Sequence, residues 1–193
     1  MKRISRLVFA VFVTAGVPIA ALAECQPGNL TSNCGFPKDI LGWTTTSGSP
    51  SHDAAEGNST PGSLLVVGAG VSITFQQCID VTGQTLPMAA GYGIDYRDSS
   101  SNAIETVNVS VADFTDAACT PGNETGNSSN VSDGITSTSY EQVSSSYTIG
   151  ATAQGVLLRV NALPFASTIT AHFDDAFLGA NVVPVELLSF GVR

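Results

Sequence analysis

Basic residues are scarce in this chain. Its 193 residues include seven Lys and Arg against 16 Asp and Glu, and the formal net charge is −9 at pH 7. Three of the seven cations stand within the first six residues; the others are Lys38, Arg97, Arg159 and Arg193. Phosphate backbones and anionic membranes are bound by clustered cations. Four isolated cations cannot form such a patch, so nucleic acid and anionic membrane surfaces are poor candidates as partners.

The sequence also lacks the local motifs of catalysis. It contains no G-x-S-x-G elbow, no H-E-x-x-H and no phosphate-binding loop, and residues 68–70 lack the rest of a dinucleotide fingerprint. His52 lies in a polar Ser-Pro-Ser-His-Asp segment, and His172 lies within an alternating strand pattern. Carboxylate pairs for glycoside hydrolysis meet only in space and have no sequence signature. We therefore expect a protein that is not an enzyme.

Residues 1–23 have the pattern of a secretory signal peptide. Three cations precede an apolar run over residues 7–15, and Ala21-Leu22-Ala23 then forms a small-residue cleavage site before Glu24. A membrane anchor is the alternative, but the run is short for a span of about 20 residues. The mature chain has four cations against 16 acids, hence a net charge of −12. We expect it to be secreted, periplasmic or on the cell surface.

The four cysteines all lie in the mature chain, at positions 25, 34, 78 and 119. In an exported protein an even number indicates disulfides, and four cysteines allow three pairings. We favour Cys25–Cys34, which would close the N-terminal segment, and Cys78–Cys119, which would tie a strand to a later loop. A metal site is the alternative, but there is no C-x-x-C and neither histidine is near a cysteine in sequence.

The composition favours β-structure, because Ser, Thr, Val, Gly and Asn are frequent and Lys, Glu and Arg are few. Short segments, several with alternating apolar residues, predict strands at 40–46, 63–67, 71–75, 88–96, 107–114, 140–149, 156–162, 168–177 and 182–192. Residues 47–62 are predicted to be a loop, and residues 120–137 a long disordered loop. The sequence thus predicts one all-β sandwich or jelly-roll domain over residues 24–180, followed by an apolar strand or tail over 181–193.

Several motifs, in order, resemble a known family. Asn33-Cys34-Gly35-Phe36 and then Leu41-Gly42-Trp43-Thr44 resemble the N-x-G-F … G-W opening of jelly-roll carbohydrate-binding modules, which accompany bacterial cellulases and xylanases. Residues 171–178, with Phe173-Asp174-Asp175, resemble the closing F-D-D-V strand of that family. The resemblance implies a galactose-binding-domain-like β-sandwich and non-catalytic binding of an extracellular polysaccharide or glycan.

Sugar binding on such a sandwich requires aromatic faces flanked by polar side chains. Tyr92 and Tyr96 are an even number of residues apart, so on a regular strand they share a face. With Arg97 beside them, and with Trp43, they are the candidate carbohydrate-binding residues. The alternative is core packing, which the apolar pattern favours for both tyrosines and the resemblance favours for Trp43.

The resemblance further implies a structural calcium. In the family an acid after the opening phenylalanine usually binds this ion together with the aspartate of the closing strand. Here Pro37 replaces that acid, so the candidate ligands are Asp39, Asp174 and Asp175. Calcium takes six to eight oxygen ligands, which two or three carboxylates and backbone carbonyls can supply. The alternative is a set of exposed acids at a strand end.

Two functions remain open. The first is a secreted carbohydrate-binding domain; the second is a structural or adhesive component of the cell surface that has no sugar site. Residues 183–190 form either a last strand or a strand offered to a surface-protein partner by edge addition. Exposure of Tyr92 and Tyr96 on one concave face would favour the first function, and burial in the core would favour the second.

Overall fold

The computed structural model describes residues 25, 27–58, 61–69, 72–98, 105–135, 138–163 and 168–180. These residues form ten strands and no helix that could cross a membrane. The strands are β1 Thr44–Ser47, β2 Ser51–Asp53, β3 Ser63–Ala69, β4 Ile73–Asp80, β5 Met88–Asp98, β6 Glu105–Phe114, β7 Glu124–Ile135, β8 Glu141–Ile149, β9 Gly155–Leu163 and β10 Thr168–Gly179.

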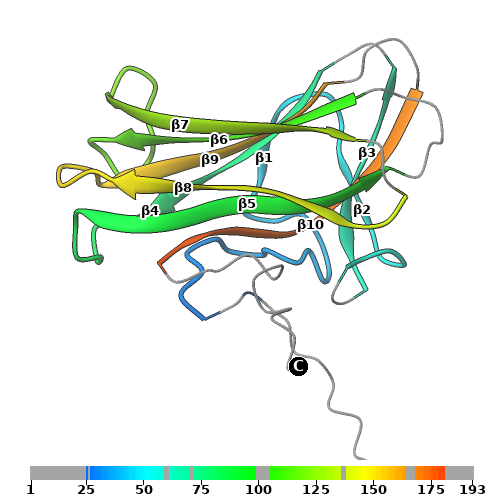
Figure 1. Cartoon of the computed structure of the whole chain (residues 1–193), viewed down its shortest axis with the longest axis horizontal. Coiled ribbons are helices and arrows are strands. Elements are labelled where there is room, and N and C mark those ends of the chain that lie inside the picture. Colours follow the sequence, from blue (N-terminus) through cyan, green and yellow to red (C-terminus); the bar gives the residue numbers. More distant parts are fainter. Residues whose placement is uncertain are drawn as a thin grey trace, which may run out of the picture.

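Two antiparallel five-stranded sheets form the two layers of a sandwich (Figure 1). Sheet I has the order β1-β4-β9-β6-β7, and sheet II has the order β2-β3-β10-β5-β8. Alternation explains the layering, because Val156, Leu158 and Val160 of β9 are fully buried while Arg159 between them is exposed. The predicted all-β sandwich is confirmed.

An aromatic chain links the two sheets through the core. Phe75 of β4 lies between Trp43 and Phe173 of β10, with ring centroids 5.6 Å and 5.3 Å away. The ring centroid of Trp43 in turn lies 5.6 Å from that of Phe36 in the N-terminal segment. All four rings are buried. The opening and closing motifs of the sequence therefore meet in one hydrophobic cluster.

The N-terminal segment extends sheet II along the second half of β10. The Leu30 N–H donates to the Leu178 carbonyl at 2.7 Å, and the Ala176 N–H donates to the Cys34 carbonyl at 2.9 Å. A disulfide joins Cys25 to Cys34 and a second joins Cys78 to Cys119. Both favoured pairings are therefore confirmed.

Strand β7 corrects the prediction of a long disordered loop over residues 120–137. It pairs with β6 from Glu124 to Ile135, and even its inward positions are largely polar, so it has no hydrophobic period. Its polar groups are bound from sheet II: the Tyr92 hydroxyl lies 3.0 Å from Ser129 Oγ, and the Tyr96 hydroxyl donates to Asp133 at 3.1 Å. Tyrosine hydroxyls thus replace the apolar contacts that a sequence pattern would reveal.

Other boundaries also differ from the prediction. The short strand β2 lies inside the predicted loop 47–62, and the predicted strand 40–46 begins only at Thr44, because Leu41 and Gly42 form a turn. Residues 1–23 and 182–192 lie outside the described residues, so the signal peptide and the C-terminal strand stay predictions.

Candidate functional site: the outer face of sheet I

The structure buries the aromatic residues predicted to bind sugar. Tyr92 and Tyr96 have no exposed surface, and Trp43 is 8% exposed. A ring without exposed surface cannot stack on a sugar, so the predicted tyrosine platform is not present. Both tyrosines point from β5 into the core, where their hydroxyls bind β7. Among the described aromatic residues only Tyr140 is not buried.

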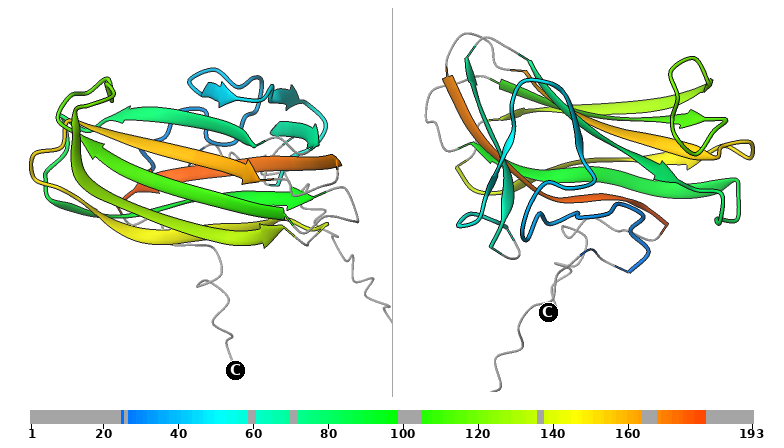
Figure 2. Two further views of the ribbon diagram at one scale, coloured as in Figure 1. Left: turned by 90° about the horizontal axis from the view of Figure 1, so that it is seen from above. Right: turned by 180° about the vertical axis from the view of Figure 1, so that it is seen from behind.

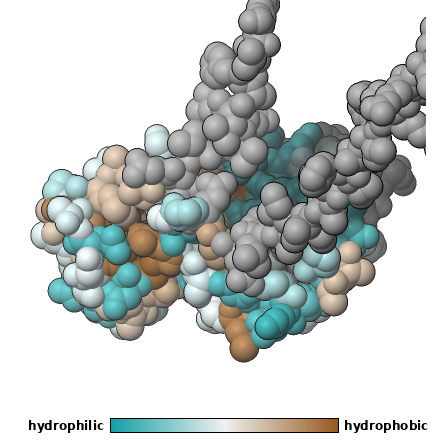
Figure 3. Space-filling view, turned by 90° about the horizontal axis from the view of Figure 1, so that it is seen from below, coloured by the Kyte–Doolittle hydropathy of each residue, from teal (hydrophilic) through white to brown (hydrophobic). Residues whose placement is uncertain are grey.

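Arg97 lies apart from these tyrosines, on the outer side of sheet II. Its guanidinium forms an ion pair with Glu56 and lies over the Tyr140 ring, 5.4 Å from the ring centroid. The surface on this side is mixed, with apolar and hydrophilic patches (Figure 3). Arg97 therefore does not join Tyr92 and Tyr96 in one site.

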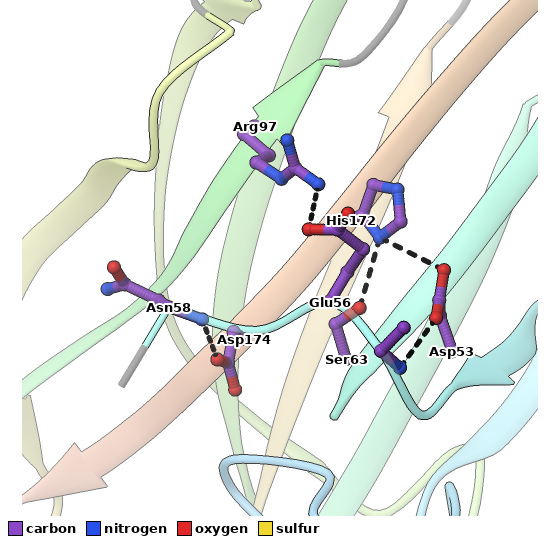
Figure 4. Close-up of polar contacts among 8 residues, drawn as sticks. Asp53, Glu56, Asn58, Ser63, Arg97, His172 and Asp174 are labelled. Atoms are coloured by element: carbon purple, nitrogen blue, oxygen red, sulfur yellow. Dashed lines mark hydrogen bonds and ion pairs between the residues drawn. The ribbon is translucent and has the colours of Figure 1, made fainter. Parts of the chain in front are cut away.

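The predicted calcium ligands have other partners. Asp39 Oδ1 accepts hydrogen bonds from the Asn33 side chain at 3.2 Å and from the Leu41 N–H at 3.0 Å. Asp174 accepts a hydrogen bond from the backbone N–H of Asn58 at 2.6 Å (Figure 4). It accepts a second from the backbone N–H of Asp175 at 2.8 Å. No group of three or more His, Cys, Asp or Glu side chains among the described residues could hold a metal ion. Calcium binding therefore stays a prediction without a ligand set in the described part of the chain.

A buried polar cluster surrounds Asp174 on the outer side of sheet II. Asp174 is directly opposite Asp95 across the β10–β5 pair, and Asn58 bridges them through its backbone N–H and its side-chain amide. The Gln142 amide also donates to Asp95, at 2.8 Å. The Nδ1 atom of His172 lies 3.1 Å from Ser63 Oγ and 3.9 Å from Asp53 Oδ2 (Figure 4).

Burial sets the protonation of this cluster. It raises the pKa of Asp174 to about 7 and the pKa of Asp95 to about 6, and the nearby Asp175 charge adds to both shifts. Burial also lowers the pKa of His172, an effect that the Arg97 charge reinforces. Asn58 and Gln142 donate hydrogen bonds to the two buried carboxyl groups, and the Ser63 hydroxyl lies within hydrogen-bond distance of the His172 ring.

Asp95→Asn is expected to stabilise the protein at pH 8 by about 2 kcal/mol and to leave its stability at pH 4 unchanged. The folded protein binds these protons more tightly than the unfolded chain, so the two carboxyls stabilise it at low pH and this contribution is lost as pH rises from about 4 to 7. The Gln142 side chain can rotate so that its Oε1 accepts a hydrogen bond from the new amide group at position 95. That oxygen is free for this role, because it is buried without a hydrogen-bond partner.

The measurement is urea unfolding of both proteins from pH 4 to pH 8. The lowered pKa of His172 gives the opposite trend below pH 6.5, so the comparison is between variant and parent at each pH. Ser146→Ala, at an exposed position of β8 and without a titratable group, is the control and should give a constant difference. A constant difference for Asp95→Asn would contradict the assignment.

The outer face of sheet I carries a row of polar side chains, one from each strand. Register places Thr44 beside Gln76, Gln76 beside Arg159, Arg159 beside Ser110, and Ser110 beside Asn130. We call these five residues the polar row. All are at least partly exposed, and no other strand covers β4, β9, β6 and β7 in the view from above (Figure 2). This face is therefore accessible to a ligand.

A second line of polar side chains runs parallel to the polar row. Thr74 donates to Asn161 Oδ1 at 2.7 Å, and Asn161 Nδ2 lies 3.5 Å from its acceptor, Asn108 Oδ1. Asn108 then donates to the Val131 carbonyl at 3.3 Å. These bonds fix the amide orientations across β4, β9, β6 and β7. Hydroxyl and amide groups held in place are suited to hydrogen bonding with sugar hydroxyls.

The opposite border of the polar row is apolar. Phe114, Cys119 and Leu157 form a small buried cluster with Ala112 against the outer side of sheet I. The Cys78–Cys119 disulfide holds the turn after β6 over this cluster. The turn is thereby fixed at one end of the exposed face.

A groove of about 350 Å³ lies between the polar row and this border. It is lined by Ser110 and Ala112 of β6, by residues 126–130 and Glu124 of β7, and by Arg159 of β9. Sequence reasoning missed this site, because its residues come from distant segments. The only signal was the polar half of the alternation in β6 and β9, which identifies a polar face and gives no chemistry.

Comparison with known proteins supports the fold. No family model and no curated protein sequence matches this chain. TmCBM61, solved with beta-1,4-galactotriose, is 12% identical over 79% of this chain and 99% of its own, with a TM-score of 0.62. A family 16 carbohydrate-binding module is 13% identical over 78% and 99%, with a TM-score of 0.58. The chain has the jelly-roll fold of carbohydrate-binding modules.

A further jelly-roll neighbour is the C-terminal family 22 carbohydrate-binding module of Clostridium thermocellum Xyn10B. It is 12% identical and covers 80% of this chain and all of its own length, with a TM-score of 0.54. At such identities the match establishes a shared jelly roll and leaves the ligand open. The resemblance seen in the sequence motifs is thus confirmed for the fold.

Proposed function

We propose that this protein is an exported, non-catalytic domain that binds an extracellular polysaccharide across the outer face of sheet I. The observation that carries the proposal is the polar row, an uncovered line of hydroxyl, amide and guanidinium groups that spans all five strands. Two disulfides support an oxidising compartment. The jelly-roll neighbours, which are carbohydrate-binding modules, support the ligand class.

The described residues also support a role without catalysis. The strongly shifted carboxyl groups, Asp95 and Asp174, are 7% and 0% exposed and lie on the opposite sheet from the polar row. A general acid must reach its substrate. These two carboxyl groups are therefore structural.

The test is titration against a panel of soluble polysaccharides by affinity electrophoresis and calorimetry. The double variant Gln76→Ala/Asn130→Ala should weaken binding by roughly 5- to 150-fold, because each lost hydrogen bond contributes about 0.5–1.5 kcal/mol. Ser146→Ala, at an exposed position on the outer face of sheet II, is the matched control. A flat titration across the panel, or undiminished binding by the double variant, would contradict the proposal.

A structural or adhesive role is the second candidate. The burial of Tyr92, Tyr96 and Trp43 favours it, because no described aromatic ring is fully exposed to stack on a sugar. The long edge strand β7, with its polar side chains, offers a surface for pairing with other chains. This role predicts self-association in analytical ultracentrifugation together with a flat glycan panel. A monomer that binds glycan would contradict it.

A further inference from the structure

We propose that the glycan bound on the polar row carries carboxylate groups, and that Arg159 binds them. This inference rests on the proposed function and names its ligand class. Arg159 stands at the middle of the polar row, with its neighbours Gln76 on one side and Ser110 on the other. It is exposed, and it also lines the groove between β6 and β7.

The guanidinium of Arg159 is held in place but not neutralised. Its Nε donates to Gln76 Oε1 at 2.9 Å, and among the described residues it forms no ion pair and no second side-chain hydrogen bond. The two terminal nitrogens are therefore available to a ligand. Arg97 provides the contrast within the chain, because its charge is paired with Glu56 and its guanidinium lies against Tyr140.

The shape and charge of the groove fit a sugar acid. The guanidinium is a planar fork of N–H donors that matches a carboxylate with two parallel hydrogen bonds. The rest of the groove wall consists largely of small or uncharged side chains, and Glu124 is the only carboxylate that lines it. A ring can therefore place its hydroxyls on Ser110 and the β7 amides while its carboxylate lies on Arg159.

The absence of an exposed ring makes this contact more important. Modules that rely on stacking present aromatic faces, whereas all described aromatic side chains except Tyr140 are buried here. A charge-assisted hydrogen bond is about twice as strong as a neutral one. Arg159 is therefore the strongest single contact that the polar row offers to a polysaccharide.

The negative net charge of the chain does not exclude such a ligand. At physiological ionic strength charges are screened over about 8 Å, so acids on distant surfaces contribute little at the groove. A direct guanidinium–carboxylate contact is screened much less. The acidic surface would instead lower the encounter rate, and moderate salt should relieve this effect.

The experiment compares each acidic polysaccharide with its own carboxyl-reduced form. Polygalacturonic acid, alginate and glucuronoxylan are titrated, since reduction replaces the carboxylate by a neutral hydroxymethyl group and keeps the chain. We expect at least one acidic form to bind about tenfold tighter than its reduced form. Arg159→Gln should abolish that preference, because it should weaken binding of the acidic form about tenfold more than binding of the reduced form. Arg159→Lys should retain part of it, because the charge stays and the fork is lost.

The outcomes separate this inference from the proposed function. Equal binding of acidic and reduced forms, or an equal loss of both in Arg159→Gln, would overturn the carboxylate assignment while glycan binding stands. Binding to neutral polysaccharides alone would do the same. Failure to bind any polysaccharide would overturn the proposed function itself. Because the Arg159 side chain is exposed, we expect Arg159→Gln and Arg159→Lys to unfold at the same urea concentration as the parent. This measurement checks that both variants are folded.

Discussion

Phe75→Ala is expected to lower the free energy of unfolding by about 3–5 kcal/mol. Phe75 is fully buried on β4 and touches Trp43 and Phe173, so its ring connects sheet I, sheet II and the segment that precedes β1. Its removal leaves a cavity between two sheets whose backbones are fixed by their ladders, which prevents the site from collapsing. Urea unfolding followed by circular dichroism and by emission of the single tryptophan measures the loss.

Two further variants bracket this result. Phe75→Leu should cost less than Phe75→Ala, since more of the ring volume stays filled. Leu41→Ala removes a large apolar side chain that is 73% exposed, and it should change stability by no more than about 0.5 kcal/mol. An equal loss for Phe75→Ala and Leu41→Ala would contradict the bridging role of the aromatic chain.

Gly93→Ala is expected to destabilise the protein by about 3 kcal/mol or more. Gly93 lies on β5 between β10 and β8, and an added Cβ would lie 2.8 Å from Ser144 Cβ and 2.9 Å from Phe177 Cε1. It would also clash with the Val143 carbonyl oxygen. Because that oxygen belongs to the backbone of a paired strand, relief requires the sheet itself to move.

Gly83→Ala is the matched control for this prediction. Gly83 lies in the turn between β4 and β5, and no atom lies within 4 Å of the position of an added Cβ. Urea midpoints of the two variants should therefore differ widely, with Gly83→Ala close to the parent. If Gly93→Ala also unfolds at the parental midpoint, the close packing of Phe177 over β5 is wrong.

The sequence predicted the parts of the fold that depend on local pattern. The alternation in β4 and β6 identified inward residues such as Phe75 and Val109, and the opening and closing motifs indicated the jelly roll. It did not predict β7, because the partners of Ser129 and Asp133 are tyrosine hydroxyls from the opposite sheet. A polar residue that is hydrogen-bonded to a distant strand has the same letter in the sequence as a polar residue in a loop.

The candidate site was beyond prediction for a different reason. Gln76 and Arg159 are neighbours only because β4 pairs with β9, a pairing that no local pattern encodes. Sequence reasoning instead chose Tyr92 and Tyr96, whose residue types suit sugar binding and whose spacing suits a strand. Spacing fixes which residues share a face; whether that face is inside or outside depends on the other layer. Here the tyrosine hydroxyls are hydrogen-bonded to the polar strand β7 of the other sheet, so both rings face inward.

The side chains of the polar row are regularly spaced, because each comes from the next strand of sheet I. They are separated by the distance between paired strands, about 4.8 Å, and the row crosses the strands rather than following one of them. A linear polymer lying along the row would meet a new strand at every step, at a spacing comparable with the advance of one ring in an extended sugar chain. Under the proposed function, the backbone hydrogen bonds between the strands of sheet I would set the distance between successive sugar contacts.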